Sequence, residues 1–204
     1  MSKVTEVELR GKVDELVVKE LKTRLGLAGL LKETKKRVLL DYTTFLKGET
    51  IEDRTTDIRV RNTNGTSEIV IKIGKWGGSD VRNEFKVQTS DSFDSLVQVM
   101  SLLGYKKGIL CVRNSEVYQL GEVEISVVEV PGHSYYFEAE IETNVETESE
   151  YLKEKILTIL SSHNLIPFSD PEFYAYIKEL NIHANGIFDS DTEPEDFFYT
   201  KFNI

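Results

Sequence analysis

The sequence predicts an α+β protein with a mainly antiparallel sheet. Strand-like segments outnumber helical ones, and the helices interrupt the strand series along the chain. Five of the strand-like segments place charged side chains on one face and apolar side chains on the other. If such a sheet closes on itself, with helices over its apolar exterior, the charged face becomes the lining of a tunnel.

The composition favours a soluble globular protein. The chain has 204 residues, of which 40% are hydrophobic and 29% charged, and its formal net charge is −10. This balance is unlike that of a general nucleic-acid binder, although cations gathered in one cleft could still bind a polyanion. The only cysteine is Cys111, and no run of residues approaches membrane-spanning length. We therefore expect a cytoplasmic monomer or homodimer with no nucleic-acid and no membrane partner.

The elements follow from periodicity and turn signals. Helical patterns cover about 12–26, 91–103, 147–163 and 171–180. Alternating patterns predict strands at about 3–11, 36–46, 57–63, 67–74, 81–88, 107–114, 117–130 and 135–143. We expect a single domain over residues 1–183 and an acidic tail over 184–204. The tail carries five aromatic residues, so part of it should pack against the body.

The hairpin at residues 57–72 gives the clearest pattern. Asn64-Gly65 suits the two central positions of a type I′ turn, because both positions need positive φ. That turn places Arg59, Arg61 and Lys72 on one face, since opposed residues share a face and side chains alternate along each strand. Three cations on a small patch repel one another unless an anion or nearby carboxylates neutralise them.

The division into a charged and an apolar face recurs in other predicted strands. The residues on their charged faces are Glu6, Glu8, Arg10, Arg82, Glu84, Lys86, Arg113, Glu138, Glu140 and Glu142. The simplest interpretation is the solvent face of a half-buried sheet. A solvent face usually mixes in Thr, Ser and Gln, whereas Glu and Arg take consecutive positions here. The glutamates also lie in the first and last strands and the cations mostly in the middle ones, which favours a cavity lining.

In order and approximate spacing, these residues resemble the CYTH, or triphosphate tunnel metalloenzyme, superfamily. The resemblance rests on EVELR at 6–10, Arg59-x-Arg61 followed by Lys72, Arg82-x-Glu84, Arg113, EAE at 138–140 and the closing helical segment FYAYIKEL. It implies a closed antiparallel β-barrel, the tunnel, with helices packed on its exterior. The superfamily includes thiamine triphosphatases, inorganic triphosphatases and class IV adenylyl cyclases.

The resemblance also implies roles for individual residues. The expected ligands of Mg²⁺ or Mn²⁺, which prefer carboxylate oxygens, are Glu6, Glu8, Glu138 and Glu140, with Glu84 and Glu129 as weaker candidates. The expected binders of a small-molecule triphosphate substrate are Arg10, Arg59, Arg61, Lys72, Arg82 and Arg113. The expected catalytic residues are Glu8, Arg10 and Lys72. Arg82 and Glu84 could equally form a simple cross-strand ion pair.

Two positions depart from the family's pattern. Cys111 stands where a basic residue is common, and Val128 where an aspartate is expected, so substrate preference and catalytic efficiency are open. The expected function is metal-dependent hydrolysis of inorganic tripolyphosphate or an organic triphosphate. A class IV-type adenylyl cyclase and a non-catalytic polyphosphate- or nucleotide-binding module are the alternatives. Trp76 could stack on a base, but a loop tryptophan more often anchors local packing.

Overall fold

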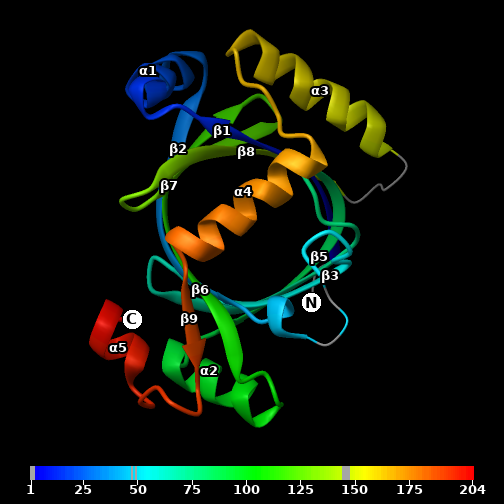
Figure 1. The fold of residues 1–204 in the computed structure, drawn as a ribbon. Coiled ribbons are helices and arrows are strands. Elements are labelled where there is room, and N and C mark those ends of the chain that lie inside the picture. The colour runs from blue at the N-terminus through cyan, green and yellow to red at the C-terminus, as the bar shows by residue number, and fades with distance from the viewer. Residues whose placement is uncertain (1–2, 47, 49, 144–147) are drawn as a thin grey trace.

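The computed structural model describes residues 3–46, 48, 50–143 and 148–204. Eight antiparallel strands form a closed barrel around an open centre (Figure 1), which confirms the predicted fold class. Their spatial order is β2-β3-β4-β5-β1-β8-β7-β6, and the pairing of β2 with β6 closes the barrel. The strands are β1 (Lys3–Val13), β2 (Leu30–Asp41), β3 (Thr56–Thr63), β4 (Thr66–Ile73), β5 (Ser79–Thr89), β6 (Lys107–Leu120), β7 (Val123–Val130) and β8 (Ser134–Thr143).

The hairpin turn sets the register as predicted. Asn64 and Gly65 both have positive φ, at 51° and 88°, and β3 pairs with β4 so that Arg61 opposes Glu68 and Asp57 opposes Lys72. The charged faces of the strands therefore point into the barrel. Their apolar faces point outward, where helices cover much of the surface.

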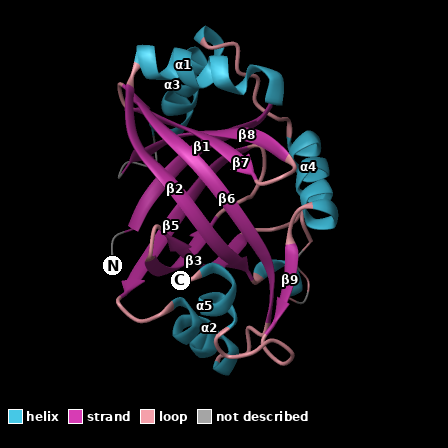
Figure 2. Ribbon diagram, turned by 90° about the vertical axis from the view of Figure 1, so that its left-hand side faces the viewer, coloured by secondary structure: helices cyan, strands magenta, loops and turns pink. Residues whose placement is uncertain are grey.

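Helices lie on two sides of the barrel and across one of its ends. Figure 2 shows α1 and α3 on one side, α2 and α5 on the opposite side, and α4 at one end. The helices are α1 (Val18–Ala28), α2 (Phe93–Leu102), α3 (Ser149–Ser162), α4 (Asp170–His183) and α5 (Phe197–Phe202), with short 3₁₀ turns at Glu15–Val17 and Thr43–Phe45. In the described part of the chain, no helix combines the length and apolarity needed to cross a bilayer.

Two hydrophobic cores hold α1, α2, α3 and α5 to the outer face of the barrel. One core joins outward-facing residues of β1, β7 and β8, such as Leu9 and Ile125, to Leu21 of α1 and Ile156 of α3. The other joins Leu40 and Val60 to α2 and α5. Removing this apolar surface from water is the main term that stabilises the closed barrel with its helices.

The tail packs against the body, as its aromatic residues indicated. Strand β9 (Gly186–Asp189) pairs with the end of β6. The ring of Phe198 lies 4.8 Å from that of Phe93 in α2, and Asp94 accepts hydrogen bonds from the backbone N–H groups of Phe198 and Tyr199 at 2.9 Å. The acidic side chain of α2 thus caps the first turn of α5.

Some predicted boundaries were wrong. The first helix was expected from residue 12, but β1 continues to Val13 and the helical turns begin at Glu15. The long second strand begins at Leu30, inside a segment that carried no alternating signal. The predicted strands 107–114 and 117–130 are divided differently, because the turn falls between Leu120 and Val123.

Candidate functional site

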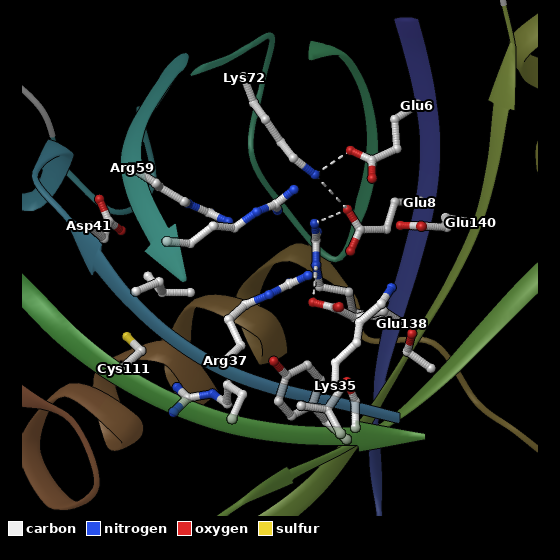
Figure 3. A pocket seen from close by; sticks show the side chains of 18 of the residues that line it. Glu6, Glu8, Lys35, Arg37, Asp41, Arg59, Lys72, Cys111, Glu138 and Glu140 are labelled. Carbon is white, nitrogen blue, oxygen red and sulfur yellow. Dashed lines mark hydrogen bonds and ion pairs between the residues drawn. The ribbon is translucent and has the colours of Figure 1, made fainter. Parts of the chain in front are cut away.

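The barrel encloses a cavity of about 510 Å³ that is lined from all eight of its strands and from α4. Figure 3 shows its charged walls: Glu6 and Glu8 of β1 and Glu140 of β8 lie on one side, Arg37 of β2 and Arg59 of β3 on the other, and Lys72 of β4 reaches between them. At one end, Tyr176, Ile177 and Leu180 of α4 line the cavity. Helix α4 lies across this end of the barrel (Figure 1). At the other end the lining residues Lys32, Glu122 and Glu142 are exposed to solvent, so we describe the cavity as a cup with its closed end at α4.

Helix α4 is anchored at its beginning. The N–H of Phe168 donates to the carbonyl of Arg10 at 2.7 Å, and the N–H of Gly78 donates to Asp170 at 3.1 Å. A capping box between Ser169 and Glu172 satisfies the first backbone donors of the helix. The closed end of the cup is therefore tied to β1 and to the loop before β5.

Three glutamates form a cluster on the carboxylate wall. One oxygen from each of Glu6, Glu8 and Glu140 lies within 4.8 Å of the other two. Glu6 and Glu8 share the inner face of β1 because they are two residues apart, and Glu8 is directly paired with Glu140 of β8. The strand pairing therefore brings together carboxylates that are more than 130 positions apart in the sequence.

Burial and neighbouring charges shift the pKa values of the three carboxyl groups in different directions. Burial raises the pKa of Glu8 to about 7, although the charges of Arg10 and Lys72 oppose this shift. Burial and the neighbouring Glu6 and Glu8 raise the pKa of Glu140. Burial also acts to raise the pKa of Glu6, but the charge of Lys72 and hydrogen bonds outweigh it and lower the pKa. The three carboxyl groups offer hard oxygen donors close to one another, which is the donor set that Mg²⁺ and Mn²⁺ prefer.

The other predicted metal ligands lie differently. Glu138 lines the cavity beside the cluster and is 3.7 Å from the Nε of Arg10. Glu84 forms ion pairs with Lys72 at 3.2 Å and Lys86 at 2.8 Å. Glu129 does not line the cavity: it accepts a hydrogen bond from Asn114, and its strand neighbour Val128 takes the inward position. Because side chains alternate along β7, this structure places Glu129 outside the cavity, away from the other predicted ligands.

Lys72 stands between the two walls. Its Nζ pairs with Glu6 and lies 3.6 Å from Glu8 and 3.2 Å from Glu84. Burial acts to lower the pKa of Lys72, but the charges of Glu6 and Glu8 outweigh it and raise the pKa. A cation held this firmly charged, with its ammonium in the cavity, can bind a phosphate oxygen as a point charge.

Arg59 and Arg61 line the opposite wall. Arg59 pairs with Asp57, and Arg61 pairs with Glu68. Asp57 is almost completely buried and also pairs with Arg54 at 2.9 Å and Arg82 at 2.7 Å. Burial acts to raise the pKa of Asp57, but these arginines outweigh it and lower the pKa. One carboxylate thus fixes the orientation of three guanidinium groups.

Arg10 and Arg82 are enclosed by partners. Arg10 donates to Glu8, to Asp80 at 2.7 Å and to the carbonyl of Gly77 at 2.8 Å. Arg82 lies behind the cavity surface and pairs with Asp57, at 3.0 Å with Asp80 and at 3.7 Å with Glu8 of the neighbouring strand β1. Glu84 forms its cross-strand ion pair with Lys72, so the alternative of simple ion pairing considered above fits both residues. The expected substrate contact of Arg82 is therefore not provided by this arrangement.

Arg37 and Arg54 were missed by the sequence analysis. Arg37 is on the inner face of β2 next to Arg113 of β6, but Leu39 breaks the charged pattern of its strand. Arg54 lies in a loop without periodicity, and its guanidinium stacks on Trp76 at 4.4 Å. Trp76 is also packed edge-on against Phe173 at 4.9 Å, which agrees with a role in local packing.

The comparisons with known proteins fit this geometry. No family model matches the chain. A curated Methanocaldococcus jannaschii protein, named as a candidate adenylate cyclase, is 28% identical over 165 residues, covering 78% of this chain and 90% of that protein. A Pyrococcus horikoshii structure has a TM-score of 0.70 at 21% identity, covering 85% of this chain and 99% of that one. A Hippeastrum structure, described as a candidate adenylyl cyclase with a dominant triphosphatase activity, has a TM-score of 0.51 at 15% identity, covering 81% and 90%.

Proposed function

We propose, from the premise that this chain is a member of the CYTH superfamily, that it is a metal-dependent hydrolase of a small triphosphate. Membership rests on the closed eight-stranded barrel and on relatives that are named as adenylate cyclases. One observation carries the proposal: the carboxylate cluster and the arginine wall face each other across one enclosed cavity. Such a site can neutralise a polyanion from two sides.

The arginine wall supplies the phosphate contacts in this proposal. Arg37 and Arg113 have no ion pair with a carboxylate in the part of the chain that the structure describes, so their charge is available to a ligand. Arg59 and Arg61 are oriented by acidic neighbours and expose the guanidinium to the cavity. Guanidinium groups match phosphate oxygens through paired hydrogen bonds, which favours a fixed orientation of the chain of phosphates.

The carboxylate wall would hold the metal. Glu6, Glu8 and Glu140 are the proposed ligands, and a bound Mg²⁺ or Mn²⁺ would neutralise phosphate oxygens and promote attack at phosphorus. Arg10 positions Glu8 through its direct hydrogen bond. Lys72 donates to a phosphate oxygen from between the walls. Glu138 lies beside the cluster and is suited to orient the attacking water.

A class IV-type adenylyl cyclase is the second candidate, because the curated relative is named as a candidate adenylate cyclase. It would bind the triphosphate in the same way, but a ribose hydroxyl would attack the α-phosphate and pyrophosphate would leave. Chromatography of the products formed from ATP separates the two, since only the cyclase yields cyclic AMP. Tight binding without turnover would instead select the non-catalytic module.

The test is a phosphate-release assay with tripolyphosphate, thiamine triphosphate, ATP and GTP, each with Mg²⁺ or Mn²⁺. We expect release from at least one of them, and its loss in Glu8→Gln. Glu142→Gln is the matched control, because Glu142 follows the cluster on the same face of β8 but lies outside it and is more exposed. Absence of release from every substrate would reject the hydrolase.

A further inference from the structure

We infer that the substrate carries an organic group, and that this group binds at the closed end of the cup, against α4. The inference rests on the proposed binding of a triphosphate and names the class of triphosphate. The observation behind it is a change in the lining: charged side chains dominate the middle of the cavity, whereas most of its apolar and aromatic side chains lie toward α4. Polar groups at that end are the amides of Asn181 and Asn185 and the ion pair of Asp41 with Arg54.

The closed end has an aromatic side. Tyr136 of β8 is directly paired with Val128 of β7, and both line the cavity. The ring of Tyr176 in α4 lies 6.0 Å from the ring of Tyr136, and Ile177 lines the cavity next to it. Flat rings beside aliphatic side chains form the kind of surface on which small organic ligands bind.

The neighbouring strands continue this apolar surface. Ile109 and Cys111 of β6 and Leu39 of β2 line the cavity, and Cys111 is paired directly with Leu39. Cys111 and Val128 are also the two positions that depart from the charged residues of the family's pattern described above. Both departures place an uncharged side chain toward the closed end of the cup. The oxygens of an inorganic phosphate bound there would lack a positively charged partner at these two positions.

Arg113 marks the border between the two regions. It lies two residues from Cys111 on the inner face of β6, and its Nη2 donates to the Oδ1 of Asn185 at 2.9 Å. Since no described carboxylate pairs with it, Arg113 can bind the phosphate that joins the organic group. The remaining phosphates then extend toward the carboxylate cluster.

Among the residues that the structure describes, the open end offers no comparable surface. Its lining is polar and charged and includes Glu33, Glu122, Glu124 and Glu142 together with Lys32. An organic group there would find few apolar contacts and would compete with water for the polar ones. The cavity volume of about 510 Å³ also lies in the range of about 300–1,000 Å³ that small organic ligands occupy. Free tripolyphosphate would leave the apolar end in contact with water alone.

The experiment compares kcat/KM for ATP, GTP and thiamine triphosphate with that for tripolyphosphate. We expect at least one organic triphosphate to exceed tripolyphosphate by about tenfold or more, the range that pocket contacts provide. Ile177→Trp should fill the closed end, lowering kcat/KM for that substrate about tenfold while tripolyphosphate changes less than about twofold. Ile182→Trp is the matched control on α4, because Ile182 is 73% exposed.

Two further measurements keep the result interpretable. Ile177→Ala removes a contact instead of filling the space, and it should also lower kcat/KM for the organic substrate selectively. Calorimetry with β,γ-methylene-ATP, a non-hydrolysable probe, should show weaker binding to Ile177→Trp than to Ile182→Trp if the preferred substrate is ATP. Circular dichroism checks that each variant is folded.

The outcomes separate this inference from the proposed function. A higher kcat/KM for tripolyphosphate, or equal effects of Ile177→Trp on all substrates, would overturn the inference of an organic group. Neither result would contradict the proposed hydrolase function. Conversion of ATP to cyclic AMP supports the organic group and overturns the hydrolase. No turnover and no binding of any triphosphate overturns both.

Discussion

Arg37 and Arg113 lie directly opposite each other on the paired strands β2 and β6, inside the cavity. Burial and the charge of Arg61 lower the pKa of Arg37, because both disfavour its cationic form. In the described part of the chain, neither arginine forms an ion pair with a carboxylate. Two adjacent cations of this kind are stable together only when an anion or solvent reaches them.

Replacing Arg37 should therefore weaken substrate binding without lowering the stability of the fold. Arg37→Gln is expected to lower kcat/KM for the triphosphate about 10- to 100-fold, because a charge-assisted contact is worth about 1.5–3 kcal/mol. The free energy of unfolding without ligand should stay equal or rise, since repulsion is relieved. Steady-state kinetics and urea unfolding measure the two effects. Arg24→Gln on the outer helix α1 is the control for kinetics, and a parallel loss of both quantities would contradict the prediction.

Asp57 is expected to be the carboxylate on which the barrel depends most. Asp57→Ala leaves Arg54, Arg59 and Arg82 without their shared partner, and breaking a buried ion pair costs about 3–5 kcal/mol. Urea unfolding should show a loss of this size. Asp53→Ala, four residues away and exposed, should cost much less. Equal effects of the two substitutions would show that the arginines do not need Asp57.

Metal affinity should rise with pH across neutrality. Because burial raises the pKa of Glu8 to about 7, Glu8 must lose a proton before it can bind Mn²⁺ as a carboxylate. The dissociation constant measured by calorimetry should therefore fall between pH 6 and pH 8, with proton release that depends on the buffer. Glu142→Gln should keep this dependence, whereas a flat pH profile in the wild type would argue against Glu8 as a ligand.

In the metal-free protein, the contribution of Glu8 to the free energy of unfolding should decrease as the pH rises. The folded state binds a proton at Glu8 up to a pKa of about 7, whereas the unfolded chain releases it near 4.5, so folding takes up a proton between these values. The contribution of Glu8 to stability is present below pH 4.5 and is lost as the pH rises toward 7. Urea unfolding with a chelator should show a smaller pH dependence in Glu8→Gln than in the wild type.

The stability of the C-terminal helix α5 against local unfolding should depend on Asp94. Asp94→Ala removes the acceptor of two backbone N–H groups at the start of α5, and loss of a helix cap costs about 0.5–2 kcal/mol. We expect hydrogen exchange in residues 197–202 to accelerate while kcat/KM stays unchanged. Asp91→Ala, before α2 and exposed, is the control. A large loss of activity would mean that the tail contributes to the site.

Local patterns predicted the inner face of the barrel well, because alternation is a property of a single strand. The Asn64-Gly65 turn determined the register of β3 and β4, and the parity of Glu6 and Glu8 placed both inside. The same parity should have excluded Glu129, which follows the inward-facing Val128. Arg37 and Arg54 gave no comparable signal, since one belongs to a strand interrupted by Leu39 and the other to a loop.

The sequence by itself determined which side chains could face a common interior, since strand alternation and turn conformation act over a few residues. Only the tertiary structure decided which of them meet. Pairing of β1 with β8 brings Glu8 to Glu140, and closure of β2 on β6 brings Arg37 to Arg113. The position of α4 across one end also depends on contacts with Arg10 and Gly78, far away in the chain. These are long-range contacts, and no local pattern encodes them.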